Sequence, residues 1–271
     1  MARVDELLRY DGRRAVVTGC ASGIGAQVVS QLGELGAEVV GLDRRRPALG
    51  LNEFHEVDLS EPASIDQAVA CIAGPVDALF NIAGVSSGIG DPLLVVTINF
   101  LGLRHLTEAL LPRLAAGSSI VSVSSLAASA YREHLRDVAP LLRTATMPEG
   151  IEWCKRHPDL VGTGYQLSKE ALILYTMRSV NDLGARGIRI NCTGPGVTET
   201  PILDQLRTAY GPQFLDDIPK PLGRVSDPQE QAAVLLFLNS RAASYISGQV
   251  VWVDGGSVGA AIAAEIEEGR A

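Results

Sequence analysis

The feature that most constrains the fold is a glycine-rich turn between a short apolar segment and an apolar helix-like run. Residues 14–18 form a predicted buried strand, and residues 38–43 form the next. The turn between the first strand and the helix contains Gly19, Gly23 and Gly25. A strand, a glycine loop, a helix and a second strand in this order predict a parallel βαβ unit that binds a dinucleotide.

Each part of the loop has a predicted task. Gly19 permits a tight turn, Gly23 lets backbone N–H groups approach a pyrophosphate, and Gly25 lets the helix pack closely on the strand. Asp43 ends the second strand, where an acid accepts the ribose hydroxyls of the adenosine half. A carboxylate there repels a 2′-phosphate, so the sequence favours NAD over NADP.

Three arginines weaken that cofactor prediction. Arg44, Arg45 and Arg46 follow Asp43 directly, and arginines in this loop could hold a phosphate. The alternative is a solvated surface turn, which we prefer.

Composition limits the class of protein. The chain has 271 residues, of which 46% are hydrophobic and 5% aromatic, which fits one large α/β domain over residues 1–271 with buried parallel strands. A net charge of −8 argues against nucleic-acid binding. A polar N-terminus and no apolar run of membrane length predict no signal peptide and no membrane partner. The four scattered cysteines show no metal spacing, so we expect a soluble cytoplasmic protein without a metal.

The rest of the chain continues the alternation of strands and helices. Helices are predicted over residues 62–73, capped by Ser60, and 93–114. Further strands are predicted at residues 54–59, 76–80, 119–123, 187–192 and 249–254. The prediction is a single Rossmann-type, doubly wound parallel sheet of about seven strands. Ligands bind such sheets at the carboxyl ends of the strands.

Tyr165 and Lys169 lie four positions apart in a helix-like run, so their side chains share one helix face. A tyrosine loses its proton near pH ~10, and a nearby lysine lowers that pKa by favouring the phenolate. Taken alone this spacing is common, and a solvated pair is the alternative.

The ordered set of motifs resembles the short-chain dehydrogenase/reductase family over residues 14–256. The motifs are Thr18-Gly19-Cys20-Ala21-Ser22-Gly23-Ile24-Gly25, Asn81-Ile82-Ala83-Gly84, Asn99, Ser125, Tyr165-x-x-x-Lys169, Asn191-Cys192-Thr193-Gly194-Pro195-Gly196 and Val253-Asp254-Gly255-Gly256. Within the family the chain is most similar to the bacterial 3α-hydroxysteroid dehydrogenase/carbonyl reductase branch, which coniferyl-alcohol dehydrogenases also resemble.

The resemblance implies catalytic roles for four residues. Tyr165 would be the acid/base, and Lys169 would lower its pKa and bind the nicotinamide ribose. Ser125 would hydrogen-bond the substrate oxygen, with its neighbour Ser124 ranked second. Asn99 would hold a water that links Lys169 to solvent.

The resemblance also implies a set of cofactor-binding residues. Ile82 replaces the family's second Asn, which puts one strand-stabilising contact in doubt. The implied NAD-binding residues are Gly19, Cys20, Ser22, Gly23, Ile24, Gly25, Asp43, Arg44, Asp58, Leu59, Asn81, Ala83, Gly84, Tyr165, Lys169, Pro195, Gly196, Val197 and Thr200.

The main departure from the family pattern is a long segment before Tyr165. We call residues 127–162 the insert; it contains two helix-like pieces that Pro148 and Gly150 are predicted to separate. We hypothesise that the insert walls the substrate pocket and masks the surface used for tetramer packing, which leaves a homodimer rather than a homotetramer. The alternative is a small surface subdomain. Its His134 and His157 are predicted to be ordinary surface histidines.

Residues 197–225 form a variable apolar segment that suits a lid over an apolar substrate, or equally a pair of core-packing helices. The predicted activity is NAD-dependent interconversion of an apolar, cyclic or steroid-like alcohol and its ketone. A coniferyl-type aryl-alcohol dehydrogenase is one alternative. A non-catalytic NAD(H)-binding sensor or scaffold is another, which the intact catalytic set argues against.

Overall fold

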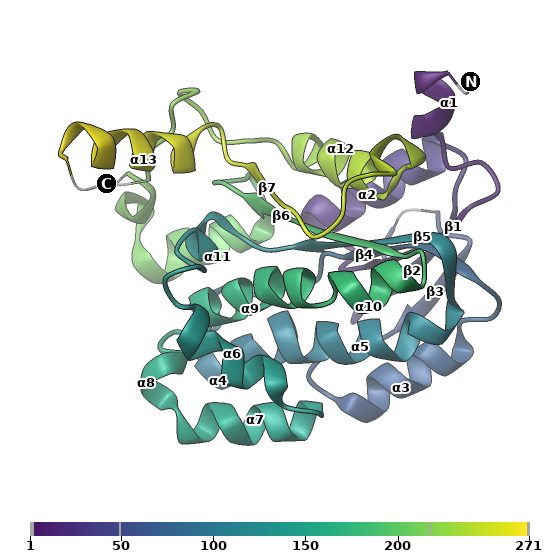
Figure 1. Cartoon of the computed structure of the whole chain (residues 1–271), viewed down its shortest axis with the longest axis horizontal. Helices are drawn as coiled ribbons and strands as arrows, with labels where there is room; N and C mark the ends of the chain where they lie inside the picture. Colours follow the sequence, from purple (N-terminus) through teal and green to yellow (C-terminus); the bar gives the residue numbers. More distant parts are fainter. Residues whose placement is uncertain (1–2, 49, 217, 270–271) are drawn as a thin grey trace.

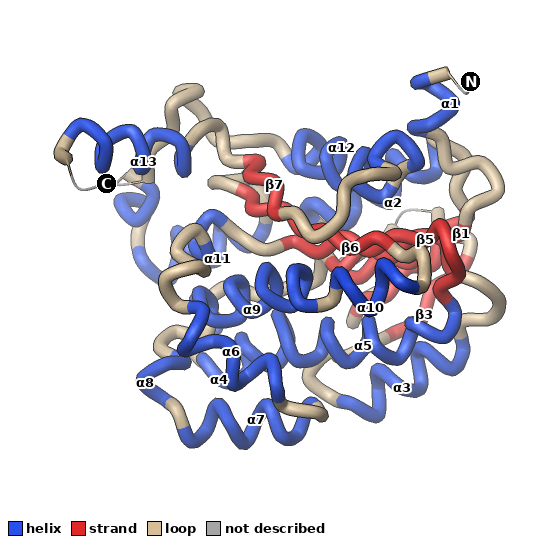
Figure 2. Tube along the Cα trace, viewed as in Figure 1, coloured by secondary structure: helices blue, strands red, loops and turns tan. Residues whose placement is uncertain are grey.

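The computed structural model describes residues 3–48, 50–216 and 218–269, and its centre is a seven-stranded sheet (Figure 1, Figure 2). All six strand pairings are parallel, in the order β3-β2-β1-β4-β5-β6-β7. The predicted doubly wound sheet is therefore confirmed, and its order reverses between β1 and β4, where such folds bind ligands. The strands are β1 (Arg14–Thr18), β2 (Glu38–Asp43), β3 (Glu53–Glu56), β4 (Val76–Asn81), β5 (Leu114–Val123), β6 (Arg189–Pro195) and β7 (Val250–Val253).

Helices cover both faces of the sheet, each over its own apolar cluster. One face carries α2 (Gly23–Glu34) and α12 (Pro228–Asn239), and the other carries α3 (Pro62–Cys71), α5 (Leu103–Leu110), α9 (Tyr165–Arg178) and α10 (Val180–Ala185) (Figure 1). The other α-helices are α1 (Val4–Leu8), α4 (Pro92–Val96), α6 (Leu135–Arg143), α7 (Met147–Arg156), α8 (Pro158–Val161), α11 (Pro201–Tyr210) and α13 (Ser257–Glu267). Short 3-10 turns are η1 (Ser87–Ile89), η3 (Leu111–Arg113), η4 (Leu126–Ala128), η5 (Pro212–Leu215) and η6 (Arg241–Ala243).

The long predicted helix is a composite. It runs through α4, the π-helical segment η2 (Thr97–Gly102), α5 and η3. Within the described residues, this one 22-residue helix, Pro92–Arg113, is long and apolar enough to cross a membrane, with a mean hydropathy of 1.3. The prediction that no apolar run reaches that length is therefore wrong. Since 72% of the apolar window is buried inside the fold, the helix serves as a core helix here.

Two element boundaries differ from the prediction. β5 begins at Leu114 rather than at residue 119, because its first residue already pairs with β4. Glu61, and not Ser60, is the N-cap residue of α3. Ser60 instead donates from its backbone N–H and its hydroxyl to Oδ1 of Asp58, at 2.8 and 2.6 Å.

The insert contains three helices, α6, α7 and α8, rather than two pieces. Pro148 and Gly150 do not separate helices; both lie in the first half of α7, where a proline costs no helical hydrogen bond. The separation is made by residues 144–146. Arg104 of α5, 3% exposed, fixes this connection by donating to Oγ1 of Thr144 and to the backbone oxygen of Thr146, each at 3.2 Å.

The two insert histidines are not ordinary surface residues, because each is half-buried and has a specific partner. His157 stacks on the ring of Trp153, with 4.4 Å between ring centroids, and its Nδ1 lies 2.8 Å from the Trp153 backbone oxygen. His134 contacts the buried carboxylate of Glu170 on α9, with 2.8 Å between Nδ1 and Oε1.

Candidate active site

The glycine loop leads directly from β1 into α2. A Cβ on Gly25 would lie 2.0 Å from the backbone oxygen of Gly19, so only glycine permits this approach of helix to turn. Ser22 precedes α2 as its N-cap without a side-chain cap hydrogen bond. The first-turn N–H groups have no acceptor within the helix, so the loop presents donors and a partial positive charge to an anion.

Cys20 was predicted to bind the cofactor, but it does not lie where the other loop residues do. Its side chain is fully buried in the apolar cluster under α2, and it does not line the cavity that the other loop residues border. Burial raises the pKa of its thiol to about 12. Cys20 is therefore a core residue here.

Asp43 lies at the carboxyl end of β2, facing the same cavity. Its Oδ2 accepts a backbone N–H of the glycine loop at 3.0 Å, and its Oδ1 accepts the N–H of Arg45 at 3.2 Å. Arg44 and Arg45 line the cavity, whereas the guanidinium of Arg46 stacks over Phe54 at 5.4 Å. Two of the three arginines thus remain near the predicted adenosine position.

Asp58 and Leu59 line the cavity beside Asp43, as predicted. Partial burial raises the pKa of the Asp58 carboxyl, but hydrogen bonds from Ser60 outweigh that effect and the net pKa is lowered. The group is therefore ionised at neutral pH and oriented by Ser60.

Asn81 does not reach the cavity, although it was predicted to bind cofactor. It is 2% exposed, and its Nδ2 donates to Oγ1 of Thr107 at 2.9 Å. The next residues, Ile82 and Ala83, donate their backbone N–H groups to the hydroxyl of Thr18, at 2.9 and 3.1 Å. Thr18 therefore joins β1 to the end of β4 where Ile82 replaces the family's Asn.

The predicted reaction centre forms where β5 ends and α9 begins. Ser125 follows β5, and Tyr165 is the first residue of α9. Gly164 makes this start possible, since its φ is +79° and a Cβ there would lie 2.2 Å from the backbone oxygen of Pro92. Ser125, Tyr165 and Lys169 all line the cavity.

Lys169 is held by the end of β5. It is 4% exposed, and its Nζ donates to the backbone oxygen of Val123 at 2.9 Å and lies 5.7 Å from the centroid of the Tyr165 ring. The hydroxyl of Ser124 donates to the backbone oxygen of Lys169 at 2.7 Å. Ser124 thus anchors the helix, and Ser125 is the serine whose hydroxyl contacts Tyr165.

Burial, and not the predicted effect of Lys169, determines the direction of the pKa shift of Tyr165 in this arrangement. Burial raises the pKa of Tyr165, and a hydrogen bond with Ser125 opposes that effect without reversing it. Burial also lowers the pKa of Lys169 to about 8. The physical reason is the same for both, because burial disfavours the charged form of either group.

Asn99 lies within the π-helical segment and is fully buried, not part of the cavity lining. Its Oδ1 accepts the N–H of Val85 at 2.8 Å, and its Nδ2 donates to the Val85 oxygen at 2.9 Å and to Oγ of Ser168 at 3.3 Å. The side chain therefore ties the loop after β4 to the tyrosine helix. π-Helical turns are frequent at functional sites.

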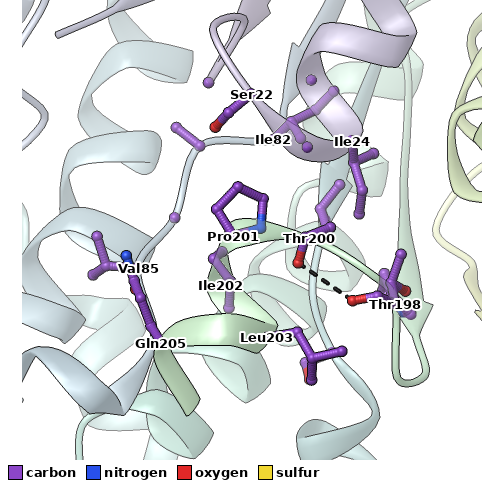
Figure 3. Close-up of a pocket in the computed structure, with 18 of the residues that line it drawn as sticks. Ser22, Ile24, Ile82, Val85, Thr198, Thr200, Pro201, Ile202, Leu203 and Gln205 are labelled. Atoms are coloured by element: carbon purple, nitrogen blue, oxygen red, sulfur yellow. Dashed lines mark hydrogen bonds between the residues drawn. The ribbon is translucent and has the colours of Figure 1, made fainter. Parts of the chain in front are cut away.

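The cavity has a volume of about 550 Å³ and extends from the glycine loop to α11 and η5. Figure 3 shows Thr200, Pro201, Ile202, Leu203 and Gln205 around it, facing Ser22 and Ile24. Pro195, Gly196, Val197 and Thr200 line it as predicted. Residues 197–225 border the cavity, as a lid would, and also bury Leu203 and Leu215, as core-packing helices would, so both interpretations of the segment stay open.

The insert does not wall the cavity, so that part of the hypothesis is wrong. Ala127 at its start lines the cavity, but α6, α7 and α8 contribute no lining residue among those described. They pack instead on α9, α4 and η2 (Figure 1).

Several lining residues were not predicted from sequence. Some lie in a strand or shortly after one, and others lie in the π-helical segment or in α11, where no local pattern marks them as lining residues. They are Leu42, Val57, Val85, Ser87, Ile98, Val123, Leu126, Thr198, Pro201 and Gln205.

Comparison with known proteins agrees with this geometry. Residues 13–136 match the model described as short chain dehydrogenase, and residues 160–258 match the one described as enoyl-(acyl carrier protein) reductase. Coniferyl-alcohol dehydrogenase of Pseudomonas sp. (strain HR199 / DSM 7063) is 38% identical over 92% of this chain and 98% of its own. The chain belongs to the short-chain dehydrogenase/reductase family.

Two further relatives of this family are similar to the chain over most of its length. The 3-alpha-hydroxysteroid dehydrogenase/carbonyl reductase of Comamonas testosteroni is 31% identical over 89% of this chain and 95% of its own. The crystal structure of 3-alpha-hydroxysteroid dehydrogenase from Pseudomonas sp. B-0831, complexed with NADH, superposes with a TM-score of 0.80 at 33% identity, covering 93% and 99% of the two chains. As a member of this family the chain is an oxidoreductase of the alcohol dehydrogenase/carbonyl reductase type that uses a nicotinamide cofactor.

Proposed function

We propose that this protein is an NAD-dependent oxidoreductase that interconverts a neutral, apolar alcohol and its ketone. The observation that carries the proposal is the convergence of Ser125, Tyr165 and Lys169 on one cavity, whose other end is the glycine loop. A cofactor bound along the loop and a substrate under α11 would meet at the tyrosine.

The chain's own residues fit a dinucleotide. The N-terminus of α2 offers donors to a pyrophosphate, and Asp43 offers a carboxylate oxygen to ribose hydroxyls. NAD supplies the hydride chemistry when bound, while the protein orients the reactants and handles the proton. The carboxylate of Asp43 at the cavity favours NAD over NADP, and Arg44 and Arg45 oppose that preference.

The proton chemistry follows from the positions of three side chains. In the oxidation direction the Tyr165 phenolate takes the hydroxyl proton of the alcohol; in reduction the phenol returns it to the carbonyl oxygen. Ser125 donates a hydrogen bond to the substrate oxygen and stabilises the charge that develops there. The ammonium of Lys169 favours the phenolate electrostatically, against the effect of burial on both groups.

The character of the substrate follows from the lining of the α11 end. Ile202, Leu206, Phe214, Leu215 and Ile218 line this end. Among the described lining residues, the acids and arginines lie at the cofactor end, and Lys169 lies at the reaction centre. A carboxylate or phosphate on the substrate would find no counter-charge beyond Lys169, so we propose a neutral apolar substrate, cyclic or steroid-like.

A panel of alcohols and ketones tests this proposal. Steroids, cyclic alcohols, coniferyl alcohol and acidic alcohols are each incubated with NAD or NADP, and the reduced cofactor is followed by absorbance. We expect turnover of neutral apolar alcohols with NAD. Turnover confined to acidic or highly polar alcohols would contradict the substrate proposal, and no turnover of any alcohol or ketone would favour a non-catalytic NAD(H)-binding role.

A coniferyl-type aryl-alcohol dehydrogenase is the second candidate. The 38% identity to a coniferyl-alcohol dehydrogenase favours it, and Phe214 supplies an aromatic face at the substrate end. Within the panel, coniferyl alcohol giving a higher kcat/KM than every cyclic alcohol would select this candidate.

We also infer that the chain acts as one catalytic domain that forms a homodimer. The insert packs on α9 and η2, and the family resemblance implies that tetrameric members pack through the helix that carries the tyrosine, so the insert would cover part of that surface. Light scattering at micromolar concentration should give twice the chain mass. A tetramer would contradict the masking role of the insert and leave the catalytic proposal unaffected.

A further inference from the structure

A buried acid that has no role in the proposed proton transfer lies beside the reaction centre. Glu170 follows Lys169 on α9 and is 2% exposed. A buried carboxylate is unfavourable unless it is paired and hydrogen-bonded, so its partners contribute to holding this turn of the helix in place.

The partners of Glu170 come from two elements. Nδ1 of His134 lies 2.8 Å from Oε1 of Glu170, and Nε2 of Gln166 donates to the same oxygen at 3.0 Å. His134 belongs to the insert and immediately precedes α6. Since α6 packs on α9, this contact is a polar link between the insert and the tyrosine helix.

The sheet holds the same turn of α9 through separate contacts. Ser124 donates to the backbone oxygen of Lys169, and the Lys169 ammonium donates to the backbone oxygen of Val123. The sheet and the insert therefore hold neighbouring residues of one helical turn, Lys169 and Glu170. Because α6, α7 and α8 do not line the cavity, their influence on the reaction must pass through α9.

We propose that His134 and Glu170 are positioning residues: their ion pair fixes the turn of α9 that carries Lys169, so turnover depends on the docking of the insert. The inference rests on the proposed alcohol oxidoreductase function. It goes beyond that function by assigning the insert a task in catalysis without contact with the substrate.

The charge of the pair gives it a defined pH dependence. The hydrogen bond and the charge of Glu170 raise the pKa of His134, with smaller contributions in the same direction from Glu133 and Asp137, although slight burial opposes them. A histidine whose pKa is raised on folding contributes stability that is fully present below the unfolded value of about 6.5. That contribution is lost as the pH rises through the higher folded pKa.

Four variants test the pair. His134→Ala removes the partner, His134→Gln keeps a neutral donor, Glu170→Gln removes the buried charge, and His134→Gln/Glu170→Gln removes both charges with little change of volume. The measurements are kcat and KM for the best alcohol of the panel, NADH affinity by fluorescence, and Tm between pH 6 and 9. His157→Ala is the matched control, because it alters the other half-buried histidine of the insert, which contacts Trp153 instead of α9.

We expect His134→Ala to lower kcat about 10-fold while KM and NADH affinity stay within about twofold, because a misplaced catalytic turn slows the chemical step. His134→Gln/Glu170→Gln, which leaves no unpaired buried charge, should recover much of the loss. The Tm advantage of the parent over His134→Gln/Glu170→Gln should be largest at pH 6 and vanish toward pH 9. His157→Ala should leave kcat and this pH slope unchanged.

Three outcomes would overturn the inference. One is an unchanged kcat in a folded His134→Ala protein, and another is a kcat of His134→Gln/Glu170→Gln as low as that of His134→Ala. The third is a Tm difference between the parent and His134→Gln/Glu170→Gln that does not vary with pH. This measurement still tests the pair if His134→Ala fails to fold or if the parent turns over no alcohol. Absence of turnover in the parent would refute the proposed function, whereas turnover that is insensitive to the pair refutes only the inference.

Discussion

The two ends of the cavity are built in different ways. At the cofactor end the cavity is lined by residues at or just after the ends of β1, β2 and β4, such as the glycine loop and Asp43. At the substrate end it is lined by apolar side chains of α11 and η5, which differ in size and carry no charge. If the cavity binds cofactor and substrate as proposed, the positions of the strand ends fix the cofactor, whereas the volumes of the side chains of α11 and η5 select the substrate.

The largest expected effect lies where the two ends meet. Tyr165→Phe keeps the ring but removes the group that exchanges the proton, so kcat should fall by about 10²–10⁴-fold. NADH affinity should stay within about twofold, as measured by fluorescence. Tyr210→Phe is the matched control, because Tyr210 stacks on Phe214 at 5.2 Å without lining the cavity.

The pH dependence of the parent adds a second readout for the same residue. Burial raises the pKa of Tyr165, and oxidation needs the phenolate, so the rate of alcohol oxidation should rise with pH. Ketone reduction needs the phenol and should keep its rate below that pKa. If Tyr165→Phe turns over within a few-fold of the parent, or if its pH profile is unchanged, Tyr165 is not the group that exchanges the proton.

A smaller effect is expected at the cofactor end. Asp43→Ala removes the carboxylate that would repel a 2′-phosphate and leaves Arg44 and Arg45 in place. The ratio of kcat/KM for NADP to that for NAD should rise at least about 10-fold. The control is Asp58→Ala. This substitution removes a carboxylate that accepts hydrogen bonds from Ser60, and we expect it to change kcat/KM for both cofactors alike. A parent enzyme that already prefers NADP would show that the arginines determine the preference.

The sequence predicted the cofactor end well because its signals are local. Gly25 lies in the first turn of α2 and Asp43 ends β2, and the alternation of strands and helices indicates a parallel sheet. Cys20 and Asn81 were wrong as lining residues for a physical reason: they belong to the same motifs, but their side chains point into the core. A motif identifies a segment, and the direction of each side chain depends on packing.

The insert could not be predicted in the same way. Its apolar residues indicated helices, but the surface they cover depends on long-range contacts such as Arg104 with Thr144. The pairing of His134 with Glu170 spans 36 positions and follows no motif, so sequence alone presented His134 as a surface residue. The pKa of Tyr165 is raised by burial, and the four-residue spacing between Tyr165 and Lys169 carries no information about burial.

The smallest expected effect compares α11, which lines the substrate end of the cavity, with the insert, which does not. Leu206→Ala shortens an apolar side chain that lines the substrate end, so KM for an apolar alcohol should rise about 10-fold, with kcat changed less. Leu160→Ala makes the same chemical change on α8, where the side chain is 40% exposed and outside the cavity, and KM should not change. Equal effects of the two substitutions would mean that the insert contributes to substrate binding after all. An unchanged KM in Leu206→Ala would instead mean that α11 covers the cavity without selecting its occupant, and that discrimination among alcohols comes from the residues around Ser125.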